Sequence, residues 1–134
     1  MQTVAKTRVR YAETDAMGIV YHANYLIWFE IARTELFRSF GLPYTRFELE
    51  GLGLAVVEAN IRYKSPAKYD DQLELKAEIA EIGSRKVSFN YQITTGDNLL
   101  CEGKTTHVFT NNEGRATSAA GYPVWQAVKQ IFNL

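Results

Sequence analysis

The chain has only one cysteine and two histidines, the residues that form disulfides, bind metals and often act in catalysis. The single cysteine, Cys101, excludes an intramolecular disulfide, which favours a reducing, cytoplasmic location. His22 and His107 have no partner at metal-ligand spacing, so we expect no metal site. Cys101 lies in an alternating apolar–polar run with no nucleophile motif around it, which predicts a core residue rather than a reactive thiol.

Excess charge and long apolar runs are lacking as well. Lysine plus arginine and aspartate plus glutamate each number 15, so the formal net charge is zero. This balance argues against a nucleic-acid partner. The apolar run at residues 25–29 is far too short to span a bilayer, and the N-terminus lacks the apolar core of a signal peptide. We therefore expect a cytoplasmic protein with no membrane span.

What the chain does have is enough apolar material for one core. Apolar residues make up 46% and charged residues 22% of 134 residues, which is typical of a single globular domain over 1–134. Aromatic residues make up 13%, and several of them crowd the segment 28–40. This composition favours a small-molecule pocket or an oligomer surface.

Apolar periodicity predicts the order of elements. Two-residue alternation predicts strands within 4–11, 54–66, 72–79, 86–94 and 99–110. A long helix is expected over 24–40, ended by Gly41 and Pro43, and a short amphipathic helix begins at Pro123. The fold class is therefore α+β, with a curled antiparallel sheet of about five to six strands around a long central helix.

The long helix is apolar around most of its circumference, so it must be wrapped rather than laid on a surface. Its narrow polar stripe includes Glu30 and Arg33, whose spacing favours an i,i+3 ion pair over a substrate role. One sheet curled around one helix leaves open edges, and a second copy of the chain commonly covers such edges. We therefore expect a homodimer or a homotetramer, without a choice between them.

Two segments carry a resemblance to a known family. Residues 9–41 contain TDAMGIVYHANY at 14–25, followed by FE at 29–30 and AR at 32–33, and residues 65–71 read SPAKYDD. They resemble the hot-dog-fold acyl-CoA thioesterases of the 4-hydroxybenzoyl-CoA thioesterase family, and most of all the branch that contains the Tol-Pal-associated thioesterase. Met17 departs from the residues that many relatives carry at its position.

The resemblance implies a hot-dog fold and an enzyme that hydrolyses a small acyl- or aromatic-CoA thioester to free acid and coenzyme A. It implies no cofactor, because coenzyme A is part of the substrate. It assigns the catalytic carboxylate to Asp15, as nucleophile or as general base. It places His22 at the N-terminus of the central helix, where a backbone N–H holds the thioester oxygen.

The chemistry suits these positions. A helix N-terminus offers unpaired N–H groups and a positive dipole end to the oxygen that becomes negative during thioester hydrolysis. Gly18 lets the loop turn closely beneath a ligand, and Asn24 can cap the helix. Cations near the pocket mouth would hold the phosphates of coenzyme A. The candidate substrate-binding residues are Gly18, Tyr21, Asn24, Tyr25, Lys68, Arg85 and Lys86.

Several alternatives stay open. Asp15 before Gly18 also fits a turn residue, and His22 can act through its backbone or its ring. A hot-dog 3-hydroxyacyl-thioester dehydratase or hydratase would pair a histidine with a carboxylate. A non-catalytic acyl-CoA-binding module is the third reading. The identity of the acyl group is left undecided.

Overall fold

The computed structural model describes residues 2–132, with side chains from Val4 onward. The elements follow the predicted order with two additions, a short 3-10 turn and a helix between the central helix and the second strand. They are β1 (Gln2–Arg8), η1 (Tyr11–Glu13), α1 (Asn24–Arg38), α2 (Tyr44–Glu50), β2 (Gly53–Tyr63), β3 (Gln72–Ile82), β4 (Lys86–Thr95), β5 (Asn98–Thr110) and α3 (Pro123–Ile131).

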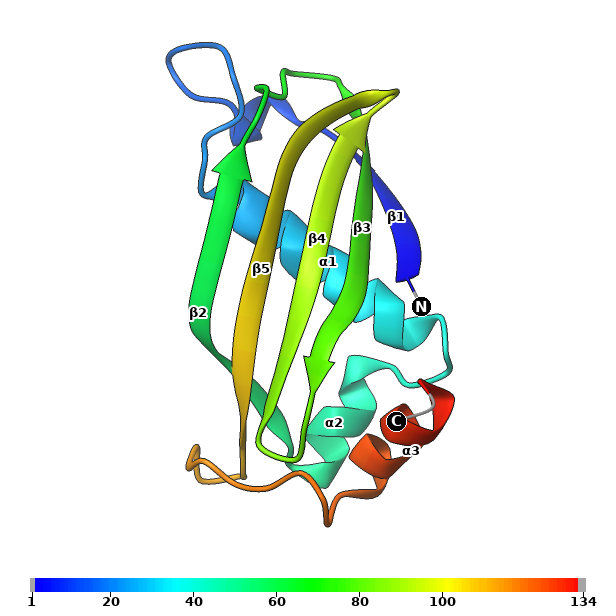
Figure 1. Cartoon of the computed structure of the whole chain (residues 1–134). Coiled ribbons are helices and arrows are strands. Elements are labelled where there is room, and N and C mark those ends of the chain that lie inside the picture. Colours follow the sequence, from blue (N-terminus) through cyan, green and yellow to red (C-terminus); the bar gives the residue numbers. More distant parts are fainter. Residues whose placement is uncertain (1, 133–134) are drawn as a thin grey trace.

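The strands form one antiparallel sheet in the order β1-β3-β4-β5-β2. The sheet curls around α1, while α2 and α3 pack at one end of it (Figure 1). This arrangement confirms the predicted α+β class, with five strands and a long central helix among residues 2–132. No helix in that range is long and apolar enough to cross a bilayer.

The core lies between the inner face of the sheet and α1. Trp28 and Phe29 of α1 are each 1% exposed, so these two aromatic residues belong to the core rather than to an open pocket. Cys101 of β5 is also fully buried, and burial raises the pKa of its thiol to about 12. A thiol that stays protonated is a poor nucleophile, so Cys101 acts as a small apolar residue.

A close approach between α1 and the sheet fixes the position of the helix. The Phe29 ring stacks on Tyr91 of β4, with the ring centroids 4.3 Å apart and the planes 5° from parallel. Beside it, Phe29 covers Gly103 of β5 so closely that a Cβ atom there would lie 2.6 Å from the ring and 2.6 Å from the Asn60 carbonyl oxygen. Only glycine leaves room for this contact.

We expect Gly103→Ala to lower the free energy of unfolding by about 1–3 kcal/mol, because overpacking a tight core forces its neighbours to shift. Urea denaturation measures the change. Gly121→Ala is the matched control, since no atom lies within 4 Å of a Cβ there. Equal stability of Gly103→Ala and the wild type would contradict the proposed contact.

One side of this core stays uncovered within a single chain. Strand β2 is one of the two edge strands of the sheet, and a bulge between Val56 and Glu58 shifts its register. Val56 and Val57 are 54% and 56% exposed, and Ile27 on α1 is 53% exposed. The predicted wrapping of α1 by its own sheet is therefore incomplete on the side of β2.

Candidate active site

Asp15 lies in a tight turn before α1. Its Oδ1 accepts a hydrogen bond from the Met17 N–H at 2.8 Å, and its carbonyl accepts one from the Gly18 N–H at 3.0 Å. Gly18 has a φ of 77°, a conformation that favours glycine. Within the described residues, Oδ2 of Asp15 has no hydrogen-bond partner, so the carboxylate both holds the turn and keeps one oxygen available.

Backbone bonds attach this turn to the loop between β2 and β3. The Val20 N–H donates to the Ala67 carbonyl at 2.9 Å, and Ile19 forms an isolated antiparallel bridge with Lys68. The Asp15 N–H donates to the Ile19 carbonyl at 2.8 Å. Lys68, which is exposed, therefore lies beside the Asp15 turn, as the predicted coenzyme A contact requires.

The N-terminus of α1 faces the same region with free donors. Among the described residues, the His22 and Ala23 amides make no hydrogen bond, and no side chain caps the helix. The predicted cap by Asn24 is wrong: its Nδ2 donates to the Glu13 carbonyl at 2.9 Å instead. Asn24 thus ties the start of α1 to η1, and the two preceding residues are exposed and have amides that make no hydrogen bond.

Two tyrosines support this end of the helix. The Tyr63 hydroxyl, at the end of β2, donates to the His22 carbonyl at 3.0 Å. The Tyr25 hydroxyl accepts from the Ala67 N–H at 3.2 Å, and its ring is 3% exposed. Tyr25 is therefore a core residue, and its N–H donates to the His22 carbonyl at 3.4 Å, so the structure does not support its predicted contact with a substrate. Sequence analysis missed Tyr63, because strand alternation alone does not mark it.

The His22 ring is exposed between aromatic neighbours. Its centroid lies 4.6 Å from that of Tyr21 and 6.4 Å from that of Tyr63. No carboxylate oxygen in the described part of the chain lies within 4.0 Å of it. The histidine–carboxylate pair that a dehydratase would need is not formed between His22 and these residues. Tyr21 is itself 48% exposed and borders this site.

Arg85 and Lys86 are not brought to the site by their own chain. They lie at the hairpin between β3 and β4, at the opposite end of the sheet from the Asp15 turn (Figure 1). Strand β4 alone has 10 residues, a length of about 33 Å at the usual strand rise. Any contact of these two residues with a ligand at Asp15 would need a second subunit.

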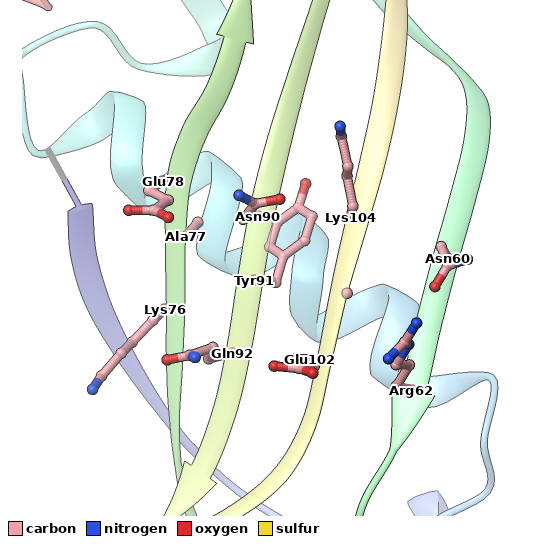
Figure 2. Close-up of a pocket in the computed structure, with 11 residues that line it drawn as sticks. Asn60, Arg62, Lys76, Ala77, Glu78, Asn90, Tyr91, Gln92, Glu102 and Lys104 are labelled. Atoms are coloured by element: carbon pink, nitrogen blue, oxygen red, sulfur yellow. The ribbon is translucent and has the colours of Figure 1, made fainter.

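A shallow hollow of about 360 Å³ lies elsewhere, on the sheet (Figure 2). Polar side chains such as Asn90, Gln92, Glu102 and Lys104 line it, and it contains no residue of the Asp15 region. Among the described residues, no three His, Cys, Asp or Glu side chains gather as metal ligands would. Volume alone therefore does not identify the active site.

The predicted ion pair between Glu30 and Arg33 is not formed. Arg33 instead donates from Nη1 to the Tyr91 hydroxyl at 3.0 Å. The Tyr91 and Thr105 hydroxyls share a 2.6 Å hydrogen bond, and Thr105 Oγ1 lies 2.8 Å from His107 Nε2. His107 is fully buried, and this burial lowers its pKa from 6.5 to about 4.

The neutral state of His107 makes stability depend on pH. The unfolded chain binds a proton at His107 below pH 6.5, whereas the folded chain does so only near pH 4, so stability falls as the pH drops through this window. We expect His107 to account for about 2 kcal/mol of lost unfolding free energy between pH 7 and pH 5. Urea denaturation at both pH values should show this loss in the wild type and a correspondingly smaller one in His107→Gln. Equal losses in both proteins would contradict the assignment.

Comparison with known proteins agrees with this architecture. The sequence pattern of the thioesterase-like superfamily matches residues 9–129. The chain belongs to this family. It is 36% identical over 93 residues to the acyl-CoA thioester hydrolase YbgC of Escherichia coli, covering 69% of each chain. Family membership confirms the predicted family and the predicted class of enzyme, a thioester hydrolase.

Solved structures of relatives have the same fold over almost the whole chain. A protein from Thermus thermophilus, TT1821, is 35% identical and superimposes with a TM-score of 0.89, covering 97% of both chains. The DHNA-CoA thioesterase from Staphylococcus aureus is 26% identical, with a TM-score of 0.91 over 99% of this chain and 92% of that one. The predicted hot-dog fold is thereby confirmed.

Proposed function

We propose that the protein hydrolyses an acyl-CoA thioester to a free acid and coenzyme A, with Asp15 as the catalytic carboxylate. One observation carries the proposal: the Asp15 turn and the unpaired amides of His22 and Ala23 lie in one hydrogen-bonded loop at the N-terminus of α1. The names of relatives such as the E. coli acyl-CoA thioester hydrolase support the substrate class.

The reaction needs two groups at this place. The amides of His22 and Ala23, at the positive end of the α1 dipole, stabilise the negative charge that develops on the thioester oxygen. Asp15 either removes a proton from an attacking water, or attacks the carbonyl carbon and forms an acyl–Asp15 anhydride that water then hydrolyses to the free acid. Coenzyme A leaves as a thiolate, which is a good leaving group, so no strong general acid is required.

The rest of the site would serve binding. Gly18 and Tyr21 border the proposed thioester position, Asn24 and Tyr25 support the start of α1 from behind it, and Lys68 offers a cation for the coenzyme A phosphates. Arg85 and Lys86 would contribute only from a second subunit. Aliphatic and aromatic acyl groups both remain candidates. The single buried cysteine suits a reducing compartment, and we place the reaction in the cytoplasm.

The two other readings have less support. A dehydratase or hydratase would need His22 beside a carboxylate, and none of the described carboxylates lies within 4.0 Å of it. A crotonyl thioester assayed by enoyl absorbance separates that activity from hydrolysis. A non-catalytic binding module would leave the available Asp15 oxygen unexplained, and it would bind coenzyme A esters without thiol release.

We expect Asp15→Asn to lower kcat by about 10²–10⁴-fold, because it removes the base while the asparagine Oδ1 still accepts from the Met17 N–H. Thiol release over a panel of acyl-CoA esters measures kcat, and calorimetry measures the retained binding of a coenzyme A ester. Asp97→Asn, at the exposed hairpin between β4 and β5, is the matched control and should keep full activity. Wild-type turnover by Asp15→Asn would refute the catalytic assignment.

The active form is proposed to be a homo-oligomer, as a dimer or a dimer of dimers. Strand β2 presents an unpaired edge, and exposed apolar side chains lie on β2 and on the neighbouring face of α1. A second copy that covers both would remove apolar area from water and bring its own basic residues toward the site. The exposed residues include Ile27, Ile31, Val56 and Val57.

We expect Ile27→Glu to dissociate the oligomer and to lower activity at least about tenfold, because burial of an unpaired carboxylate at the interface is costly. Analytical ultracentrifugation measures the mass, and thiol release measures the activity. Leu49→Glu is the matched control, since Leu49 is 87% exposed on α2, away from this surface. A monomeric wild type at micromolar concentration would refute the oligomer.

A further inference from the structure

Arg33 is a half-buried cation without an anion. Its Nη1 donates to the neutral Tyr91 hydroxyl at 3.0 Å. No carboxylate oxygen among the described residues lies within 4.0 Å of its guanidinium, and its other N–H donors have no acceptor there. Its guanidinium carbon lies 5.9 Å from the centroid of the Phe89 ring, so an aromatic face partly stabilises the charge but no counter-charge does, and an anion could still bind there.

Arg33 lines a cavity that can hold such an anion. The cavity has a volume of about 240 Å³ and lies between α1, the first residue of α2, and β2. It is smaller than the usual pocket for a whole ligand, so it fits one end of a larger molecule. Apolar side chains form part of its wall and hydroxyl groups another part: Glu30, Arg33, Thr34, Phe37, Tyr44 and Leu54.

We propose that this cavity binds a carboxylate at the far end of the acyl group, which makes acyl-CoA esters with a terminal carboxylate the preferred substrates; this inference rests on the proposed thioesterase function. A planar guanidinium matches a carboxylate through two parallel hydrogen bonds, which a lysine cannot reproduce. Arg33 is a specificity-determining residue in this arrangement and takes no part in bond cleavage.

The distance along α1 suits a chain of several methylene groups. Glu30, at the near side of the cavity, lies about 10 Å beyond Ala23 at 1.5 Å of rise per residue. Helical side chains tilt toward the N-terminus, which brings the cavity closer to the thioester position. Leu26, 42% exposed, lies between the two places on the same helix. An acyl chain thus meets amides at one end, apolar surface in the middle and a cation at the other end.

The arginine is held in place before any ligand arrives. Tyr91 fixes its Nη1, and Thr105 and His107 fix the Tyr91 hydroxyl in turn. A fixed donor loses less conformational entropy on binding than a free surface arginine does. Glu30 lines the same cavity but is exposed, so it repels a bound carboxylate from the outer side. The two charged residues should therefore have opposite effects on such a substrate.

The test compares matched pairs of substrates in variants of the full chain. Hexanoyl-, octanoyl- and decanoyl-CoA are paired with adipoyl-, suberoyl- and sebacoyl-CoA, which differ by the terminal carboxylate. The readout is the kcat/KM of the ester with the terminal carboxylate divided by the kcat/KM of its uncharged partner. We expect Arg33→Gln to lower this ratio by about 10- to 100-fold, mainly through KM, whereas Glu30→Gln raises it.

Arg38→Gln is the control, because Arg38 is exposed on the same helix and paired with Glu35. It should leave the ratio unchanged, and Arg33→Lys should restore it only in part. Equal losses on both members of a pair in Arg33→Gln would mean a structural role and would overturn the proposal. A wild type that prefers the uncharged member of every pair would overturn it as well.

A binding experiment separates this inference from the proposed function. Hexanoate and hexanamide differ only in the carboxylate, and their effect on thermal unfolding needs no turnover. We expect hexanoate to raise the Tm of the wild type and of Arg38→Gln but not of Arg33→Gln, and hexanamide to raise none of them. If the wild type released no thiol from any of the esters, the proposed thioesterase function would be refuted, but the anion site would not. Identical responses to hexanoate in the wild type and in Arg33→Gln would refute the anion site alone.

Discussion

The contact of Phe29 with Gly103 and Tyr91 determines where the central helix lies on the sheet. The backbone of α1 lies nearest to β3 and β1, and the Phe29 ring reaches from it to stack on Tyr91 of β4 and to cover Gly103 of β5, where a Cβ atom would clash with the ring. The two regions of α1 that we propose to be functional both depend on this contact of Phe29. The amides of His22 and Ala23 lie at one end of the helix, a few residues after the Asp15 turn, and Arg33 reaches Tyr91 about one turn beyond Phe29.

Local features of the fold and the site could be predicted from the sequence. Strands β3, β4 and β5 follow from two-residue alternation because the sheet covers one side of a core and leaves the other side to solvent. Asp15, Gly18 and His22 lie within one short segment, so a turn followed by a helix brings them together whatever the rest of the chain does. The family motif then adds the chemistry that spacing alone does not provide.

Contacts between distant segments could not be predicted. Arg33 was expected to pair with Glu30, three residues away, yet it bonds to Tyr91, which is 58 positions along the chain. Tyr63 reaches the His22 carbonyl across 41 positions. Arg85 and Lys86 lie at the wrong end of the sheet for a site within one chain. Each of these outcomes depends on strand order and register, which a single sequence does not specify.

The free amides of His22 and Ala23 have a consequence for the evolution of stability. Most helices stabilise their first turn with a side-chain cap, which contributes about 1 kcal/mol. Here no side chain does so, and Asn24, a residue suited to capping, is directed to the Glu13 carbonyl instead. A substitution that satisfied these amides would make the folded state more stable while closing the place where we propose that the thioester oxygen binds. Selection for activity and selection for thermal resistance therefore oppose each other at this single turn of helix.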